Sequence, residues 1–418
     1  MHKVVGSILF GGVLSVVSTA LVFAASGKQN TGQQKLPAAL PASCHVSSAW
    51  CVQSAQKPKR TDYVKNQLLL LYGSDKPANF ADKVMKKYHL QERSNSELSS
   101  IKQAMIIAGT NGQDPLELVS SINKQQKEIE ANEDNIFFTA ATARGSGYPL
   151  ALTGIEAAHK YTKGRGVRIG MIDTPIDITH RSLSNARVQR IELVLSGNSG
   201  NQQHGTEVAG VLISQNPRIG IAPEATLLSV SAFRANPKRP QQRSSTGSLV
   251  AKALDIIIRE KVDVLNLSFA GGKDRLVDKM IKRATNSGIV VVASAGNGGP
   301  RAKPAYPAAI PGVIAVTAVD KGERLFGGAN RGSYIDLAAP GVDILTTSPR
   351  GSFNVSTGTS LATAHVTGVI ALLMSMNKQG FRSDVLERTA VDLGRRGRDN
   401  DFGHGLVNVD RALNIIRR

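Results

Sequence analysis

Three side chains of the kinds used in nucleophilic catalysis stand at the ends of predicted secondary-structure elements. Asp173 closes the apolar strand GVRIGMID, His204 opens the segment HGTEVAG, and Ser360 lies in GTSLATAHVTG at the start of a helix. Taken singly, each has an ordinary structural role as a turn former, a packed imidazole or a helix N-cap. Together they supply an orienting carboxylate, a base active near neutral pH and a hydroxyl nucleophile.

The elements that must position these residues alternate between strands and helices from Gly166 onward. Strands are expected at 167–172, 226–230, 262–267, 290–295 and 313–319, and helices at 206–214, 248–260, 279–287 and 360–376. Such alternation is typical of an α/β fold with a parallel sheet covered by helices on both faces. Chemistry in such sheets lies at the carboxyl ends of the strands, where Asp173 is expected.

Several ordered blocks between about residues 148 and 412 resemble the subtilisin-like serine proteases, whose catalytic residues follow the order Asp, His, Ser. Besides the three segments above, the blocks are GIAPEATL, DVLNLSFAGG, VVVASAGNGG, YPAAIPGVIAVTAVD, LAAPG and FGHGLVN. The resemblance implies the subtilisin-like fold and a serine endopeptidase that cleaves protein or peptide substrates through an acyl-enzyme. Asp173 would orient His204, and His204 would take the proton of Ser360.

The same resemblance assigns residues that bind the substrate. Asn297 in SAGNGG matches the side-chain donor to the oxyanion, beside the backbone amide of Ser360; a turn residue in a glycine-rich loop is the alternative. Ser268, Phe269 and Ala270 match the strand that pairs with the substrate backbone. Ser294, Ala295 and Gly296 match the wall of the primary specificity pocket, and Ala305 matches its floor. None of them is a carboxylate, which favours apolar over basic substrate side chains.

Four positions depart from the family pattern. Pro175 follows the catalytic Asp in DTP where DTG or DSG is usual, and Glu207 replaces the second His of HGTHVAG. Ala364 replaces the usual Pro of the serine helix, and Leu361 follows the nucleophile where Met is common. No triad member is lost, which favours an active enzyme; a catalytically inactive subtilisin-like binding protein is the alternative.

No metal or cofactor is predicted. The stretch VLISQNPRIGIAP is short and has no carboxylate, so the calcium loop that some relatives carry there is expected to be absent. Calcium elsewhere in the chain is left open.

The order of predicted strands and helices in residues 63–140 indicates a separate module. Strands are expected at 68–72, 91–98, 102–108 and 136–138, and helices at 80–88 and 116–131. Asp114, Pro115 and Glu117 fit an N-cap, a first helical position and the third position of the second helix. The order β-α-β-β-α-β predicts a small α+β, ferredoxin-like module with two helices on one face of an antiparallel sheet.

The position of this module resembles that of the family's propeptide, which assists folding and inhibits the enzyme until cleaved. The following link, TAATARGSG, combines small residues with two glycines, as a protease-accessible junction should. Cleavage is therefore expected between Phe137 and Tyr148, ahead of a catalytic domain at 145–418. A permanent binding module is the alternative.

Residues 1–25 carry information about the cellular compartment. The run from Val4 to Ala25 has no charged residue and ends in small residues, which fits a signal peptide cleaved after Ala24. The run is also long enough to stay uncut as a membrane anchor through residues 4–25. In both cases the rest of the chain is expected outside the cytoplasm, secreted or periplasmic, after a linker at 26–62.

Only two cysteines occur, Cys44 and Cys51. An oxidising compartment would allow them to form a small local disulfide, with a free pair as the alternative. Two cysteines alone cannot make a four-ligand metal site.

The chain is basic, with 51 Lys and Arg against 32 Asp and Glu and a formal net charge of +19. The excess is spread along the sequence, and aromatic residues make up only 5%. Nucleic-acid binders concentrate charge and interleave it with aromatic residues, so no nucleic-acid partner is expected. A solvated basic surface is the prediction, and a basic extracellular adhesion module is the alternative function.

Overall fold

The structure is a computed structural model that describes residues 63–417 apart from 78, 140–147, 195–201 and 237–238. The predicted leader, the linker and the pair Cys44 and Cys51 fall on residues 1–62 and lie outside the described residues. The predicted cleavage junction at 140–147 lies outside them as well.

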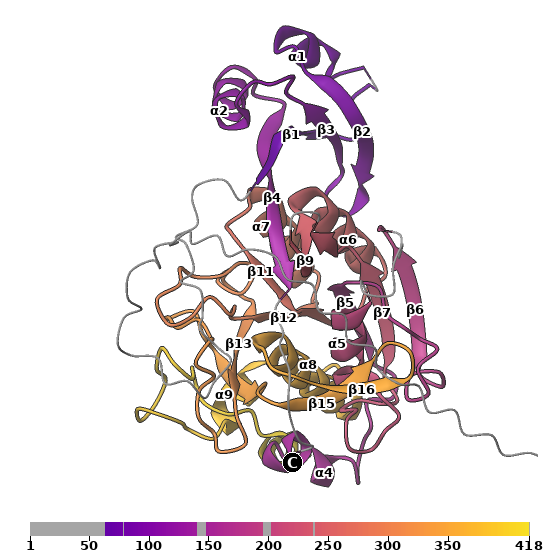
Figure 1. The fold of residues 1–418 in the computed structure, drawn as a ribbon, viewed down its shortest axis with the longest axis vertical. Helices are drawn as coiled ribbons and strands as arrows, with labels where there is room; N and C mark the ends of the chain where they lie inside the picture. The colour runs from indigo at the N-terminus through magenta and orange to yellow at the C-terminus, as the bar shows by residue number, and fades with distance from the viewer. Residues whose placement is uncertain (1–62, 78, 140–147, 195–201, 237–238, 418) are drawn as a thin grey trace, which may run out of the picture. The chain divides into compact units, whose positions relative to one another are not determined.

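A seven-stranded parallel sheet forms the centre of residues 148–417, the part of the chain in which the sequence predicts the catalytic residues (Figure 1). Its order is β14 (Leu337–Pro340), β13 (Ile314–Val319), β12 (Val290–Ser294), β10 (Val264–Leu267), β5 (Arg168–Asp173), β7 (Thr226–Ser231) and β6 (Arg187–Glu192). The inner strands are continuous apolar runs because both of their faces are buried. The parallel sheet predicted from the sequence is confirmed.

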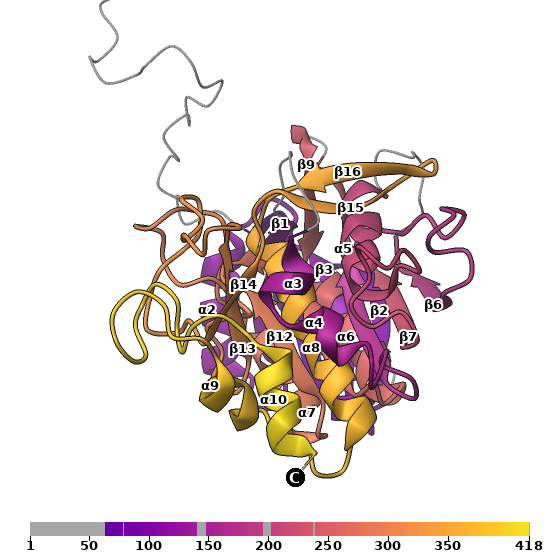
Figure 2. The same ribbon diagram turned by 90° about the horizontal axis from the view of Figure 1, so that it is seen from below.

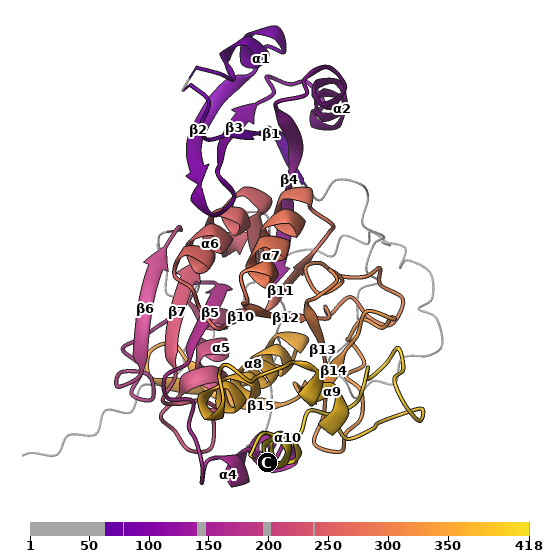
Figure 3. The ribbon, with the colours of Figure 1, turned by 180° about the vertical axis from the view of Figure 1, so that it is seen from behind.

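Helices cover both faces of this sheet (Figure 3). Helices α5 (Gln203–Ile213) and α8 (Thr359–Met376) pack on one face, and α6 (Gly247–Arg259) and α7 (Arg275–Asn286) pack on the other. Neighbouring residues of one strand point to opposite faces, so Val264 packs with α5 and α8 while Leu265 packs with α6 and α7. The predicted two-sided helix cover is confirmed.

Helix α8 is apolar around almost its whole circumference. Among the described residues it is the one helix long and apolar enough to cross a bilayer, but 89% of that stretch is buried inside the protein. Its close packing needs Gly368, where an added Cβ would lie 2.6 Å from Ile221. Helix α8 is therefore a core helix that holds Ser360 at its first turn.

Residues 63–139 form an antiparallel sheet in the order β2-β3-β1-β4. The elements are β1 (Tyr63–Gly73), α1 (Asp82–Lys87), β2 (Gln91–Leu98), the 3₁₀ helix η1 (Ser99–Ile101), β3 (Gln103–Gly109), α2 (Pro115–Gln125) and β4 (Glu130–Thr139). Leu68, Leu70 and Ile106 of the sheet share one core with Val84 of α1 and Ile122 of α2. The two helices thus cover one face of the sheet.

The prediction that the second helix runs to residue 131 is wrong. Asp114 caps the helix by accepting a hydrogen bond from Leu116 N at 2.8 Å, but α2 ends at Gln125. Asn123 bonds both the N–H and the C=O of Ala131 at 2.8 Å, and Ala131 pairs with Leu70 of β1. Strand pairing therefore overrides the helical pattern, and β4 begins well before the predicted strand at 136–138.

The strand β4 carries part of the contacts of this module with the helices α6 and α7, and η1 adds hydrogen bonds through Ser100. Asp134 accepts hydrogen bonds from the backbone N–H and the hydroxyl of Ser248 in the first turn of α6, at 2.8 and 2.9 Å. Asn135 donates to Asp274, which caps α7 through Val277 N. Burial raises the pKa of Asp134 to about 6 and also raises the pKa of Asp274.

Several short elements were not predicted. They are β8 (Arg234–Asn236), β9 (Arg239–Thr246), β15 (Ile344–Ser348), β16 (Ser352–Ser356), α3 (Pro149–Leu152), α4 (Ile155–Ala158), α9 (Asp384–Thr389) and α10 (Val409–Ile416), besides the sheet-edge strands β6 and β14. Helices α3, α4 and α10 lie beside α8 (Figure 2). Helices α3 and α4 have four residues each, too few to show a helical periodicity in the sequence.

Candidate active site

Asp173 and His204 meet at the carboxyl end of β5. Asp173 is the last residue of the strand and fully buried, and His204 lies in the first turn of α5. The imidazole Nδ1 is 2.7 and 2.9 Å from the two carboxylate oxygens. Because a carboxylate only accepts, Nδ1 carries the proton of the neutral imidazole, and Nε2 is then the nitrogen that can act as a base.

The turn after β5 holds α5 in place. The hydroxyl of Thr174 accepts a hydrogen bond from Gly205 N at 2.8 Å, directly after His204 in the chain. A Cβ at position 205 would lie 2.3 Å from the Thr174 carbonyl oxygen, so only glycine allows this approach. The unusual Pro175 in this turn leaves Asp173 in contact with His204.

Ser360 is fully buried in the first turn of α8. Its Oγ donates to the carbonyl oxygen of Ser268 at 3.0 Å, and the Ser268 hydroxyl donates to the Ser360 carbonyl oxygen at 2.8 Å. This exchange joins the start of α8 to β11 (Phe269–Gly271). His365 lies further along α8 and is also buried: burial lowers its pKa to about 4, and its Nδ1 lies 2.8 Å from the Leu361 carbonyl oxygen.

Asn297 follows β12 in a glycine-rich loop and contacts the residue before Ser360. Its Oδ1 accepts from the backbone N–H of Thr359 at 3.2 Å and from the Thr359 hydroxyl at 2.7 Å. A backbone N–H can only donate, so the atom facing it must be the oxygen of the Asn297 amide. The amide NH₂ group is therefore the part of Asn297 that can donate to a substrate.

The predicted substrate strand and pocket come together beside Ser360. Gly271 of β11 exchanges backbone hydrogen bonds with Tyr306, next to the predicted floor residue Ala305. The Ser294 hydroxyl donates to the Phe269 carbonyl oxygen at 3.1 Å and ties the wall to the strand. A Cβ on Gly296 would lie 3.1 Å from the Cβ of Ala305, so wall and floor are in close contact.

The chain's own strand β4 lies along β11. The pairing is antiparallel, with Phe269 opposite Thr139 and Gly271 opposite Phe137. On its other side β4 pairs with β9, with Phe137 opposite Ser245. Residues 137 and 138 therefore lie between two strands in extended conformation, and Thr139 continues the pairing with β11 (Figure 1).

The sequence model of the Subtilase family matches residues 164–405, which contain all of these site residues from Asp173 to Ser360. The chain belongs to the subtilase family. Subtilisin E of Bacillus subtilis (strain 168) is 30% identical over 305 residues, covering 70% of this chain and 77% of subtilisin E. The thermophilic serine proteinase of Bacillus sp. (strain AK1) is 32% identical over 302 residues, covering 68% and 73%. This subtilase is accordingly a serine endopeptidase.

A solved structure shows the same fold. The crystal structure of fervidolysin from Fervidobacterium pennivorans, described as a keratinolytic enzyme related to subtilisin, matches with a TM-score of 0.72 at 24% identity. The match covers 86% of this subtilase but only 62% of the fervidolysin chain. The comparison supports the subtilisin-like fold of this chain.

The structure gives the departures from the subtilase pattern a physical role. Glu207, one turn after His204, is buried, and its Oε1 accepts from Gln203 at 2.5 Å and from Asn354 of β16 at 2.9 Å. Leu361 and Ala364 are fully buried in α8. In the described part of the chain, no group of three or more His, Cys, Asp or Glu is arranged to hold a metal ion.

Sequence reasoning missed the residues that support Asn297. Thr359 directly precedes Ser360 in the sequence, and this position next to the predicted nucleophile is a signal that could have indicated its contact with Asn297. Asn330 and Tyr334 lie in the connection between β13 and β14 and contact the loop around Asn297, but no local pattern distinguishes them. Only chain folding brings their polar groups to the site.

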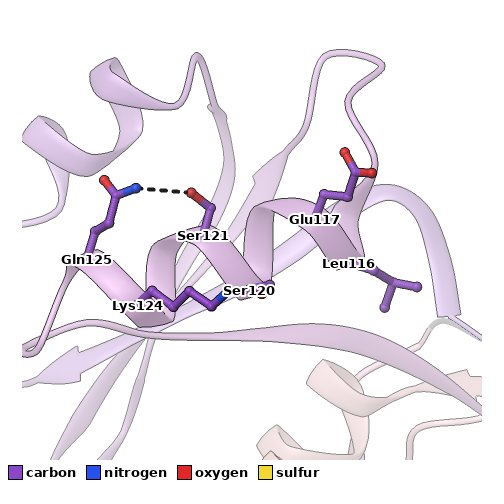
Figure 4. Close-up of a pocket in the computed structure, with 6 residues that line it drawn as sticks. All are labelled: Leu116, Glu117, Ser120, Ser121, Lys124 and Gln125. Atoms are coloured by element: carbon purple, nitrogen blue, oxygen red, sulfur yellow. Dashed lines mark hydrogen bonds between the residues drawn. The ribbon is translucent and has the colours of Figure 1, made fainter.

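A shallow hollow lies on the module, and Figure 4 shows the side chains that line it. One helix, α2, supplies its described lining: Leu116, Glu117, Ser120, Ser121, Lys124 and Gln125. Its polar groups include a hydrogen bond from Gln125 to Ser121 at 3.4 Å. No element of the catalytic part lines this hollow, so it adds nothing to the candidate active site.

Proposed function

We propose that this subtilase is an extracytoplasmic endopeptidase that uses Asp173, His204 and Ser360 as its catalytic triad. The contact of His204 Nδ1 with Asp173 supports this assignment because it leaves Nε2 as the proton acceptor. Ser360 Oγ passes its proton to Nε2 as it attacks the scissile carbonyl carbon, and His204 then protonates the leaving amine. Water attacks the resulting acyl-enzyme with His204 as base, which releases the acid product and restores Ser360.

Asn297 and the backbone N–H of Ser360 would stabilise the oxyanion of the tetrahedral intermediate. The N–H groups in the first turn of a helix have no partner within the helix, and the helix dipole favours negative charge there. The orientation of Asn297 by Thr359 supports the role of its NH₂ group as the second donor.

The primary pocket would prefer apolar side chains. Its proposed wall and floor consist of small or neutral residues, and no carboxylate is present at Ser294, Ala295, Gly296 or Ala305 to pair with a basic side chain. Ser268, Phe269 and Ala270 would align the substrate backbone. Peptides with apolar residues before the scissile bond are the expected substrates.

We further propose that residues 63–140 are a propeptide that inhibits the enzyme. The observation that supports this best is the pairing of β4 with β11 and β9, because a substrate strand would use the same backbone groups of β11. With β4 in place, these groups are already occupied. The permanent-module alternative would require that the active enzyme keep β4 on β11.

The strand register suggests which bond is cut. In the β4–β11 ladder Phe269 faces Thr139, the last residue of β4, and Ser268 directly precedes Phe269 in the chain. The Ser268 carbonyl oxygen is the atom that Ser360 Oγ contacts at 3.0 Å. We therefore propose self-cleavage between Ala140 and Ala141, within the range from Phe137 to Tyr148 expected from the sequence.

N-terminal sequencing of the wild-type protein and of a Ser360→Ala variant tests these proposals together. The wild type should begin at residue 141, hydrolyse an apolar peptide and appear outside the cytoplasm. The variant should be inactive, keep residues 63–140 covalently joined, and begin at residue 25 if the signal peptide is cleaved. Active wild-type enzyme that still contains residues 63–140 in the same chain would disprove the propeptide role.

A further inference from the structure

Asn330 makes three hydrogen bonds that surround Asn297. It is 4% exposed and lies between β13 and β14. Its backbone N–H donates to the Gly296 carbonyl oxygen at 3.0 Å, and its Oδ1 accepts from Gly298 N at 2.8 Å. Its Nδ2 donates to the Lys303 carbonyl oxygen at 3.2 Å. Asn330 thus binds the peptide groups on both sides of Asn297.

Tyr334 extends these contacts to the primary pocket. Its hydroxyl donates to the Ala295 carbonyl oxygen at 2.8 Å, one residue before Gly296. The hydroxyl also interacts with the Asn330 side chain and with the backbone of Ala305. The proposed wall and floor of the pocket are therefore joined through Asn330 and Tyr334.

The loop around Asn297 needs such support because glycines flank it. Gly296 has a φ of 99°, in the region where glycine is favoured, and Gly298 follows on the other side. Glycine leaves the backbone wide conformational freedom, so the loop's own sequence does not hold Asn297 in one place. A displacement of about 1 Å at a catalytic group can cost about 10²-fold in rate.

The fit of Asn330 is specific to its amide. A Cβ on Gly296 would lie 2.8 Å from Asn330 Nδ2, so the two residues are closely packed. An aspartate at 330 could accept from Gly298 but could not donate to Lys303, and a leucine could do neither. The Asn330 amide therefore hydrogen-bonds both the loop that contains Asn297 and the segment that leads to the pocket floor at Ala305.

We propose that Asn330 is a positioning residue that holds the oxyanion donor Asn297 and, with Tyr334, couples the primary pocket to that donor. This inference rests on the role proposed above for Asn297. Thr359 holds the Asn297 side chain, and Asn330 holds the peptide groups before and after Asn297. Binding in the pocket and stabilisation of the oxyanion then depend on the same buried side chain.

A double-mutant cycle tests whether Asn330 acts through Asn297. The four proteins are the wild type, Asn330→Ala, Asn297→Ala and the double variant, each produced as the full chain, self-processed and normalised by titration of the reactive serine. Asn330→Ala should lower kcat by about 10- to 100-fold in the wild-type background, in line with a loop displacement of about 1 Å. In the Asn297→Ala background the same change should lower kcat by less than about twofold.

Asn408→Ala is the matched control. Asn408 also uses a side-chain amide to hold backbone, accepting from Arg411 N at 2.9 Å as the N-cap of α10, but it contacts no residue of the loop from 295 to 305. This variant should lower the melting temperature while leaving kcat unchanged. An equal loss of kcat in Asn408→Ala would attribute the effect of Asn330→Ala to general destabilisation and would overturn the inference.

The remaining outcomes are also decisive. An equal loss of kcat from Asn330→Ala in both backgrounds would overturn the inference while leaving the role of Asn297 intact. No loss from Asn297→Ala alone would refute the oxyanion role itself and, with it, this inference. If Asn330→Ala does not fold, Tyr334→Phe removes one oxygen atom and repeats the cycle; its loss of kcat should likewise disappear in the Asn297→Ala background, and its persistence there would overturn the inference.

Discussion

The chemistry of single residues in this subtilase follows from which partner donates and which accepts. Asp173 can only accept, so the proton of His204 is held at Nδ1. The backbone N–H of Thr359 can only donate, so the Asn297 amide turns its oxygen toward Thr359 and keeps its NH₂ group as a donor. Neither orientation depends on bound substrate, and both are therefore preorganised for the reaction.

Leu361 provides a residue-scale prediction about oxidation. This side chain is fully buried directly after Ser360. A methionine there would be converted by peroxide to a polar sulfoxide, which leucine cannot form. After the same peroxide treatment, a Leu361→Met variant should lose a larger fraction of its peptidase activity than the wild type. Equal loss in the two proteins would show that oxidation elsewhere limits activity.

At the scale of elements, Glu207 connects the helix α5, which carries His204, to the hairpin of β15 and β16, which leads to Ser360. The hydroxyls of Thr346 and Thr347 in β15 donate to the carbonyl oxygens of Glu207 and Thr206 in α5. The Glu207 carboxylate adds the bond from Asn354 in β16, and β16 ends four residues before Ser360. The second histidine of the usual family pattern is thus replaced by a carboxylate with its own two donors.

Replacing Glu207 with alanine should destabilise the protein. The change removes the hydrogen-bond acceptor of the Gln203 and Asn354 side chains. Such a loss typically lowers the free energy of unfolding by about 1 to 3 kcal/mol. The matched control is Glu260→Ala, which removes a carboxylate 45% exposed and paired with Arg168, and which should cost less than about 1 kcal/mol. Denaturant unfolding of both variants in a Ser360→Ala background measures the difference. Equal costs would mean that the contacts of Glu207 contribute little.

On the scale of the whole molecule, two kinds of contact join the module to the catalytic part. One is the pairing of the strand β4, and the other is a set of hydrogen bonds to buried carboxylates. Asp134 of β4 is bonded to Ser248 of α6 and to Gln67 of β1, and Asp274 of the catalytic part accepts from Asn135 of β4. Burial raises the pKa of both carboxyl groups, so their charged forms are disfavoured in the joined state. The contact is therefore sensitive to pH.

Asp134 should make the unprocessed chain relatively more stable in acid. Its pKa is raised from 3.8 to about 6, so its favourable contribution is complete below about pH 4 and is lost as the pH rises through 6. We compare two proteins in a Ser360→Ala background, one with Asp134 and one with Asp134→Asn. The free energy of unfolding of the Asp134→Asn variant, relative to that of the protein with Asp134, should therefore rise by about 2 to 3 kcal/mol between pH 4 and pH 7. Denaturant unfolding at each pH measures this difference. A difference that does not change with pH would contradict the predicted protonation.

The sequence alone was sufficient to predict the parallel sheet with helices on both faces, because strands buried on both sides must be continuous apolar runs. It was sufficient for the family as well, because the segments around Asp173, His204 and Ser360 are contiguous and keep their order. Local sequence patterns predicted the wrong element where strand pairing determines the conformation. The stretch after Gln125 continues a helical pattern, yet Ala131 lies in β4 opposite Leu70.

Only the tertiary structure decided which distant groups meet. Asp173 and His204 are 31 residues apart, and their contact depends on the close approach that Gly205 allows to Thr174. The contact of Gly298 with Asn330 spans 32 residues, and no periodicity marks either partner. Strand and helix patterns report which face of an element is buried, whereas hydrogen bonds between loops depend on how the chain returns to the same place. For this reason the sequence indicated the candidate catalytic residues, while the residues that hold them in place became visible only in the folded chain.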